Sequence, residues 1–222
     1  MSLKNNNIIT VDGPSASGKG SLAKALAKEL DFILLDSGLL YRAYSYCYYQ
    51  SKNHSAAKGL FSNLRIESVD HEMHVLENNK DITSVLRHEN IAKSASQLSS
   101  LKETRDNLIS FQRDLASDNG LVADGRDMGT VVFPDAGTKI FLVADAEVRA
   151  KRRFLELQNA GQDVNMRDLI EDIRLRDEAD KVREISPLMP ADDSIEVNSS
   201  NLTPQEVLKI VLKIYKEHTK EV

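Results

Sequence analysis

The sequence predicts an α/β protein in which helices cover a parallel sheet. Five short apolar runs have the composition of buried strands, and segments of helical length separate most of them. The first run leads into a glycine-rich turn and then a helix-like segment, which is the order of a phosphate-binding loop. In open parallel sheets, ligands bind beyond the carboxyl ends of the strands, so we expect the functional site at that edge.

The predicted strands are short, and the sequence indicates some of them more clearly than others. Each is bounded by polar or glycine-containing segments, as expected of strands buried on both faces. The predicted strands are Ile8–Val11, Phe32–Leu35, Leu121–Ala123 and Lys139–Val143, with Ile195–Val197 as a weaker fifth.

Helical spacing separates these runs. The segment Leu22–Leu30 has leucines at every fourth position, and apolar residues in Leu101–Leu115 mark another helix before the third strand. The last helix has the clearest start, because Thr203 can cap it, Pro204 suits its first position and Glu206 completes a capping box.

One segment breaks the alternation of strands and helices. From Leu64 to Thr83 the pattern is strand-like and polar on one side, with a turn at Asn78–Asp81. We expect a small antiparallel hairpin or three-stranded insert here. A second irregular stretch, Asn159–Asn165, joins two charged helices and has the composition of a lid tip that moves.

The most informative stretch is the glycine-rich turn after the first strand. Gly13 and Gly18 permit backbone angles and a close approach that a side chain would obstruct. Successive N–H groups can then point at phosphate oxygens, and the following helix adds a partial positive charge. Lys19 supplies a point charge for the outer phosphates. The predicted phosphate-binding residues are Gly13, Pro14, Ser15, Ala16, Ser17, Gly18, Lys19, Gly20 and Ser21.

The hydroxyl group that usually binds metal is displaced by one position in this loop. Lys19 is followed by Gly20, and Ser21 carries the hydroxyl. Asp124 directly follows the third predicted strand, as the acidic residue that holds Mg²⁺ does in related loops. We expect Ser21 and Asp124 at Mg²⁺, the aspartate through water, whereas a helix cap or turn is the alternative for Asp124.

Two arginines indicate a second anion beside the loop. Arg42 follows the second predicted strand and Arg126 follows the third, each in a segment that contains Asp and Gly. Both therefore lie on the loop's side of the sheet. Planar guanidinium groups suit phosphate oxygens, whereas a surface ion pair is the alternative for either arginine alone.

Two charged helical faces add further candidates. On the first, Arg176, Asp180 and Arg183 share one side of a helix. A solvated charged face is the usual explanation for such a pattern. Phosphoryl transfer needs positive charge around several phosphates, which favours a functional role. The second face, on the helix before the lid tip, is the arginine cluster Arg149, Arg152 and Arg153.

Composition narrows the class of protein. The formal net charge of the 222 residues is −5, which argues against general nucleic-acid binding. Cys47 is the only cysteine, so an internal disulfide is excluded and a reducing compartment fits. The N-terminal residues lack the apolar region of a signal peptide, and no apolar run approaches the length of a membrane span. We expect a cytoplasmic monomer that binds neither nucleic acid nor membrane.

Longer motifs resemble those of bacterial cytidylate kinases over nearly the whole chain. The block Ala123–Pro134, with its Asp-Gly-Arg-Asp-Met-Gly-Thr sequence, and the extra insert are more specific than the loop alone. The other motifs are Val11–Gly20, Leu35–Gly38 with Tyr41 and Arg42, Ser94–Gln97, and Arg176–Asp177 with Ser186–Leu188.

This resemblance implies a three-layer P-loop kinase with a five-stranded parallel sheet, a small antiparallel insert and a helical lid. It implies one domain, residues 1–222, in which the insert on the monophosphate side spans 61–92 and the lid spans 152–168. ATP is the implied phosphoryl donor, with Mg²⁺, and CMP or dCMP is the implied acceptor. The implied catalytic residues are Lys19 and Arg126, with Arg152 and Arg153 as lid arginines that close over the transferring phosphate.

The resemblance also implies a residue set for the acceptor nucleotide. Its members would read cytosine, contact the sugar or hold the phosphate. The segment Asp177–Val182 has fewer arginines than in some relatives. The implied residues are Ser96, Arg105 and Asp127 at the base, Arg176 and Asp180 at the sugar, Arg42, Arg126 and Arg183 at the phosphate, and Ser15, Ser37 and Tyr41 nearby.

Two other classes of protein share a phosphate-binding loop. A P-loop kinase of a small metabolite, such as shikimate or gluconate, would not need an insert for a nucleotide base. A GTPase-like switch predicts an Asn-Lys-x-Asp guanine motif, and Asn79–Ile82 lacks the final acid. An assay with ATP and each nucleoside monophosphate would separate these classes.

Overall fold

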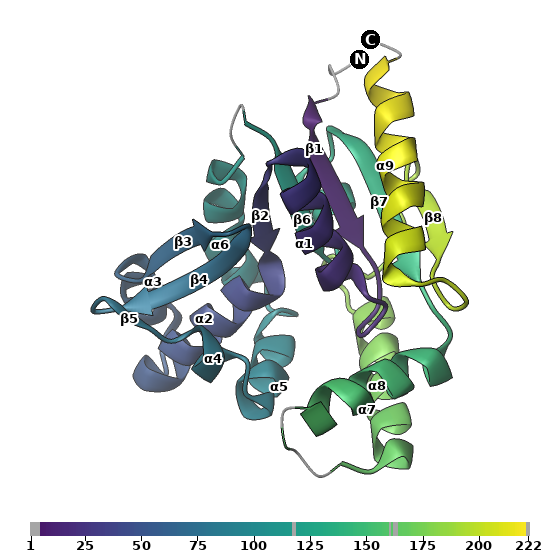
Figure 1. The fold of residues 1–222 in the computed structure, drawn as a ribbon. Coiled ribbons are helices and arrows are strands. Elements are labelled where there is room, and N and C mark those ends of the chain that lie inside the picture. The colour runs from purple at the N-terminus through teal and green to yellow at the C-terminus, as the bar shows by residue number, and fades with distance from the viewer. Residues whose placement is uncertain (1–4, 117–118, 160, 162–163, 221–222) are drawn as a thin grey trace.

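Five parallel strands form the central sheet of the computed structural model, which describes residues 5–116, 119–159, 161 and 164–220. All five predicted strands are present, including the weaker fifth, so the predicted sheet is confirmed (Figure 1). In order across the sheet they are β2 (Ile33–Asp36), β6 (Leu121–Gly125), β1 (Asn5–Asp12), β7 (Ala136–Val143) and β8 (Ile195–Asn198).

The register of these strands brings three acidic residues to one edge of the sheet. Asp36 at the end of β2 lies opposite Asp124 in β6, and Asp12 at the end of β1 lies opposite Gly125. Parallel strands place their carboxyl ends together, so segments distant in sequence meet here. The glycine-rich loop and the Asp-Gly-Arg-Asp block are therefore neighbours.

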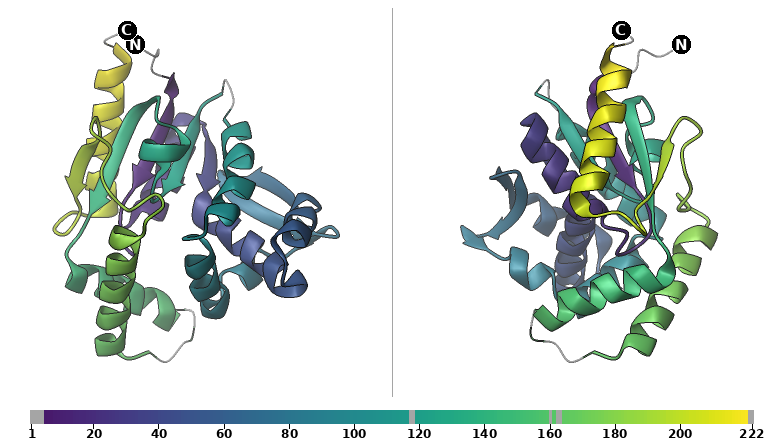
Figure 2. Two further views of the ribbon diagram at one scale, coloured as in Figure 1. Left: turned by 180° about the vertical axis from the view of Figure 1, so that it is seen from behind. Right: turned by 45° about the vertical axis from the view of Figure 1, so that its right-hand side comes forward.

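Helices cover both faces of the sheet and complete the predicted three layers (Figures 1 and 2). Strand residues alternate between two apolar clusters, with Ile8 in one and Ile9 in the other. Helices α1 (Lys19–Leu30) and α9 (Pro204–Lys220) pack in the cluster of Ile9. The other cluster contains residues of α2 (Ser37–Ser51), α3 (His54–Ser62), α5 (Glu89–Leu98) and α6 (Lys102–Asp114).

The helix starts follow the capping chemistry of the sequence. The predicted capping box of α9 is confirmed, because Glu206 accepts from the Thr203 N–H at 2.8 Å and its own N–H donates back to the Thr203 hydroxyl at 3.3 Å. The α2 helix starts directly after β2, where Asp36 Oδ1 accepts from Leu39 N at 2.9 Å. This cap fixes the entry of α2 at the edge where the site lies.

The predicted insert is three-stranded and antiparallel, with β3 (Arg65–Val69), β4 (Glu72–Glu77) and β5 (Lys80–Asp81). Lys80 and Asp81, predicted as part of a turn, form the short third strand. The reason is that Asn78 and Asn79, with φ values of 51° and 64°, already reverse the chain in a two-residue turn. Apolar residues of β4 and of the following α4 (Thr83–Leu86) join the cluster that contains α2.

Two helices beyond β7 correspond to the predicted lid. They are α7 (Ala146–Asn159) and α8 (Met166–Val182), which lie together on the carboxyl side of the sheet (Figure 1). Residues 160, 162 and 163 of the predicted lid tip lie outside the described residues. The boundaries 61–92 and 152–168 stay predictions. No described helix has the length and apolar character needed to cross a membrane.

Candidate active site

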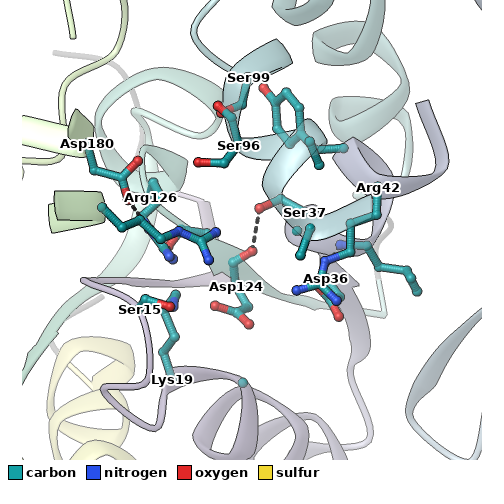
Figure 3. Close-up of a pocket in the computed structure, with 18 of the residues that line it drawn as sticks. Ser15, Lys19, Asp36, Ser37, Arg42, Ser96, Ser99, Asp124, Arg126 and Asp180 are labelled. Carbon is teal, nitrogen blue, oxygen red and sulfur yellow. Dashed lines mark hydrogen bonds and ion pairs between the residues drawn. The ribbon is translucent and has the colours of Figure 1, made fainter. Parts of the chain in front are cut away.

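A cavity of about 290 Å³ lies at the carboxyl ends of β2 and β6, beside the glycine-rich loop (Figure 3). A larger one, of about 740 Å³, opens between α5, α7 and α8 and shares part of its lining with the first. The predicted site residues that line the first cavity are Ser15, Ala16, Gly18, Lys19, Gly20, Ser21, Ser37, Tyr41, Arg42, Ser96, Arg105, Asp124, Arg126, Asp127, Arg176, Asp180 and Arg183.

The glycine-rich loop has the backbone expected of an anion cradle. Ala16 and Gly18 are both left-handed, with φ values of 57° and 95°. Gly13 has φ 151°, and a Cβ there would overlap the carbonyl group of Leu142 in β7. Lys19 begins α1, and its Nζ donates to Pro14 O at 3.2 Å. The loop therefore holds its lysine beside the cavity, and no carboxylate of the described residues contacts the ammonium group directly.

Lys19 and Asp124 are half-buried and shift each other's charge state. Burial lowers the pKa of Lys19 to about 7, and the positive charge of Arg126 adds to this shift, whereas Asp124 opposes it. Burial raises the pKa of Asp124 to about 6 against the attraction of Lys19. Asp124 Oδ1 has no hydrogen-bond partner within the described part of the chain. The side chains of Lys19, Asp124 and Arg126 converge in Figure 3.

Arginines and one aspartate gather where the second anion is expected. Arg126 Nε donates to Asp180 Oδ2 at 3.0 Å, and Arg183 Nη1 lies 3.8 Å from Asp180 Oδ1 (Figure 3 shows the first pair). Burial alone would raise the pKa of Asp180, but these arginines and Arg176 hold it below its usual value. Arg176 Nε and Arg183 Nη2 are buried without an acceptor among the described residues. Burial, and then the charge of Arg126, lowers the pKa of Arg176 to about 10.

The predicted base-reading residues meet at the far end of the cavity. Arg105 and Asp127 form a buried ion pair, and Arg105 Nη1 also donates to Ser99 O at 2.7 Å. Arg105 lies over the ring of Tyr41 at 5.7 Å from the ring centre, and burial raises the pKa of that phenol to about 12. Ser96 lies beside Ser99 in Figure 3. A donor and an acceptor are therefore held together, with little exposure to solvent, at one end of the cavity.

Asp12 supports this pocket from the sheet and was not among the predicted site residues. Its carboxylate accepts from Met128 N at 2.8 Å and from Gly129 N at 2.7 Å, at the start of the π-helical turn η1 (Met128–Val132) that follows Asp127. Burial raises the pKa of Asp12 to about 7. Because Asp12 directly precedes Gly13, it joins the glycine-rich loop to the base-reading segment.

The three arginines of α7 have different surroundings. A solvated face is the wrong explanation for Arg149, which is 5% exposed and forms a two-pronged ion pair with Asp177. Arg152 lies outside the lining of the first cavity and donates to Ser17 O at 2.9 Å. Arg153 lines the larger cavity and pairs with Glu89 of α5 at 2.9 Å. Only Arg153 therefore faces the open space between the lid helices and α5.

Some lining residues were missed by the sequence analysis. Asp36 lines the cavity, and its place at a strand end opposite Asp124 was a usable signal. Arg87 and Ser99 also line it, but they come from helix ends after the insert, where no spacing pattern marks them. Gly13, Pro14 and Ser17, predicted at the phosphates, lie behind the loop surface that lines the cavity.

Comparison with known proteins identifies the family. The pattern of the cytidylate kinase family matches residues 9–217. This chain belongs to the cytidylate kinase family. The cytidylate kinase of Pseudomonas syringae pv. tomato is 44% identical over 216 residues, which cover 92% of this chain and 93% of the relative. That of Pasteurella multocida is 40% identical over 222 residues, 97% of this chain and 98% of the relative. The family implied by the sequence motifs is thus confirmed.

Proposed function

We infer that this member of the cytidylate kinase family is a nucleoside-monophosphate kinase that uses ATP to phosphorylate CMP or dCMP. The observation that carries this reading is the excess of buried cationic groups around one cavity next to the phosphate-binding loop. Arg176 Nε and Arg183 Nη2 have no acceptor in the described structure, and a buried charged donor without a partner is costly. Two phosphate-bearing ligands would supply the missing negative charge.

ATP is assigned to the loop of residues 13–21. Its left-handed residues and the start of α1 present N–H groups to an anion, as phosphate cradles do. Lys19 then neutralises charge on the outer phosphates and on the transferring group. Binding of a polyanion would also reverse the depression of the Lys19 pKa, since the phosphates offset Arg126 and Arg176.

The acceptor phosphate is assigned to Arg42, Arg126 and Arg183, with Ser15 and Ser37 nearby. Arg42 lines both cavities. Arg126 and Arg183 lie on either side of Asp180, which partly neutralises them in the ligand-free protein. A phosphate of charge near −2 can accept from both guanidinium groups and leave Asp180 for the sugar. Asp180 and Arg176 are therefore the proposed contacts of the ribose or deoxyribose hydroxyls.

The cytosine base is assigned to Ser96, Arg105 and Asp127, beside Tyr41. Asp127 would accept from the exocyclic amine and Arg105 would donate to the ring nitrogen. In the ligand-free structure these two side chains satisfy each other. Cytosine can insert between them with a donor facing Asp127 and an acceptor facing Arg105, so that both buried charges stay paired.

The reaction needs positioning more than covalent chemistry. An oxygen of the acceptor phosphate attacks the γ-phosphorus in line, the bond to the β–γ bridging oxygen breaks, and ADP leaves. No general base is required, because a phosphate monoester is already largely ionised near neutral pH. Lys19 and Arg126 point into the space between the two nucleotide sites and would stabilise the charge of the transition state (Figure 3). Arg153 can join them when it leaves Glu89 as the lid closes.

The residues at the loop also fit Mg²⁺. Asp124 has a buried carboxylate oxygen without a partner among the described residues. A Cβ on Gly20 would lie 3.3 Å from its other oxygen, so Asp124 faces the start of α1. Ser21 lines the same cavity. Mg²⁺ usually keeps several waters and takes one or two carboxylates plus substrate phosphates, so Ser21 and Asp124, the latter through water, are a sufficient protein set. The ion would neutralise charge on the phosphates during transfer.

The remaining assignments concern organisation. We expect residues 61–92 to act as the monophosphate-side insert and residues 152–168 as the lid, since the larger cavity lies between α5 and the lid helices. We also propose that the protein is a cytoplasmic monomer, since its single cysteine fits a reducing compartment. Burial raises the pKa of Cys47 to about 11, which keeps it a thiol. Light scattering coupled to gel filtration would measure the oligomeric state.

A coupled assay tests the proposed function. ADP production would be followed with ATP, Mg²⁺ and each of CMP, dCMP, UMP, AMP and GMP. Turnover with CMP and dCMP that far exceeds the others is expected. Equal use of all monophosphates would overturn the assignment of the base pocket, and no ADP production with any of them would overturn the kinase assignment.

A further inference from the structure

Two arginines of α7 contact the back of the phosphate-binding loop. Arg149 Nη1 donates to Ser15 O at 3.1 Å, and Arg152 Nη1 donates to Ser17 O at 2.9 Å. Ser17 O also accepts from the hydroxyl of Ser199, at 3.0 Å, which follows β8. Side chains from two distant parts of the chain thus bind two alternate carbonyl groups of the loop, and two of the three, Arg149 and Ser199, are buried.

These two carbonyl groups precede the two left-handed residues. Ala16 follows Ser15 with φ 57°, and Gly18 follows Ser17 with φ 95°. A left-handed conformation costs a non-glycine residue roughly 1–2 kcal/mol and persists only where surrounding contacts enforce it. The contact of Arg149 with Ser15 O is such a restraint on the peptide that leads into Ala16.

The same contacts set the direction of two N–H groups. A trans peptide points its C=O and N–H in opposite directions, and the described chain has no cis peptide. With Ser15 O and Ser17 O facing α7, the N–H groups of Ala16 and Gly18 point away from α7. Both residues line the cavity, and neither N–H has an acceptor within the described part of the chain. They are therefore available to phosphate oxygens.

The arginines are themselves held in place. Arg149 Nη1 and Nη2 donate to the two carboxylate oxygens of Asp177 at 3.1 and 2.5 Å, and its Nε donates to Ala144 O at 2.9 Å. Arg152 Nη2 donates to Ser199 O at 2.6 Å. A guanidinium group with most of its donors fixed has little freedom to turn toward a nucleotide, so its effect must pass through the loop.

We propose that Arg149 and Arg152, assisted by Asp177 and Ser199, are positioning residues that hold the phosphate-binding loop in its ATP-binding conformation through Ser15 O and Ser17 O. This inference rests on the proposed assignment of residues 13–21 to ATP. It replaces, for Arg152, the direct contact with the transferring phosphate that the family resemblance implied. It also assigns a role to Arg149 and Asp177, which the proposed nucleotide contacts do not use.

The decisive variants are Ser199→Ala and Arg152→Lys, with the double variant. Ser199 is 2% exposed and does not line the cavity. Its hydroxyl lies 3.0 Å from Ser17 O and 3.2 Å from Val143 O, and it accepts from Arg152 Nη1 at 3.0 Å, so it can affect ATP through the loop either directly or by way of Arg152. Ser200→Ala is the matched control, because the Ser200 hydroxyl accepts from Asp145 N at 2.9 Å and does not touch the loop. Asp177→Asn tests Arg149 without changing any group that contacts the loop.

Binding of ATP and of tripolyphosphate, which lacks base and sugar, would be measured by calorimetry, together with KM for both substrates and the melting temperature. Loss of one hydrogen bond predicts a roughly threefold to tenfold weaker binding of both polyphosphates by Ser199→Ala, with KM for CMP unchanged. The fold loss of affinity in the double variant should not exceed the product of the fold losses in the two single variants, because both donors act on the same carbonyl group. Amide NMR signals of Ala16 and Gly18 should shift in Ser199→Ala and not in Ser200→Ala.

Three results would overturn the inference. The first is unchanged polyphosphate binding and unchanged amide signals in Ser199→Ala. The second is an equal rise of KM for ATP and CMP, which indicates general loss of structure. The third is an Arg152→Lys variant that binds ATP weakly but tripolyphosphate normally, which indicates a contact with adenosine. If the unmodified protein bound neither polyphosphate, the proposed function itself would fail instead.

Discussion

Lys19 should be partly deprotonated in the ligand-free protein, and ATP should return its proton. Burial, and then the charges of Arg126 and Arg176, lower the pKa of this half-buried lysine to about 7, and within the described chain no carboxylate contacts its ammonium group directly. Phosphate oxygens would stabilise the charged form, so the pKa of Lys19 should rise well above its ligand-free value when ATP binds. Binding is then linked to proton uptake.

The ligand-free pKa sets the size of the effect. With a pKa of about 7, roughly half a proton should be taken up at pH 7 and about 0.9 at pH 8. If only the charged lysine binds phosphate well, the affinity should fall about eightfold between pH 7.5 and 8.5. In this window Asp124, with a pKa of about 6, stays ionised, and Arg176, with a pKa of about 10, stays charged. Asp12, with a pKa of about 7, also titrates near this window from its place behind the loop, so the comparison with Lys19→Met separates the contribution of Lys19 from that of Asp12.

Calorimetry in buffers of different ionisation enthalpy would measure the proton uptake. Lys19→Met, which keeps the length of the stem without the charge, should bind weakly and with little dependence on pH over this window. The unfolding free energy supplies a second check. A lowered pKa of Lys19 in the folded state means that the unfolded chain binds more protons above about pH 7. Stability of the unmodified ligand-free protein should therefore rise between about pH 7 and 9, below the range in which the raised pKa of Cys47 acts in the opposite direction. Proton uptake that is absent, or equal in Lys19→Met, would refute the reasoning.

Three further outcomes are expected. CMP should exceed UMP by at least about thirtyfold in kcat/KM, because uracil creates two mismatches worth roughly 1–3 kcal/mol each, and Asp127→Ala should cut this ratio mainly by harming CMP. An undiminished ratio in the variant would contradict the base assignment. Asp180→Ala should raise KM for CMP with little change for ATP, whereas an equal loss of ATP affinity would exclude the sugar contact. Hydrogen exchange in β3–β5, and in the described parts of α7 and α8, should slow when CMP and an ATP analogue bind together, and unchanged exchange in both regions would count against closure.

Local patterns in the sequence were sufficient for the architecture. Apolar runs separated by helical spacing predicted all five strands, because strands of a parallel sheet are buried on both faces. The order of β1, the glycine-rich turn and α1 predicted the phosphate-binding loop, because these three elements follow one another directly in the sequence. The carboxyl-end rule then brought Arg42, Asp124 and Arg126 to one edge, and the register of β2 and β6 confirms that arrangement.

Partners of individual side chains were decided only by the tertiary structure. Asp12 accepts from Met128 N, 116 residues away, and Arg149 donates to Ser15 O, 134 residues away. No periodicity links such pairs, since their contact depends on how separate strands and helices are placed by the whole core. For this reason the sequence pattern around Arg149 was typical of a solvated helical face, although the side chain is buried against Asp177. The sequence alone determined the edge of the sheet that carries the site and most of the residues that line it. The packed core decided which residues from outside those motifs join them, and which side chains hold the loop instead of lining the cavity.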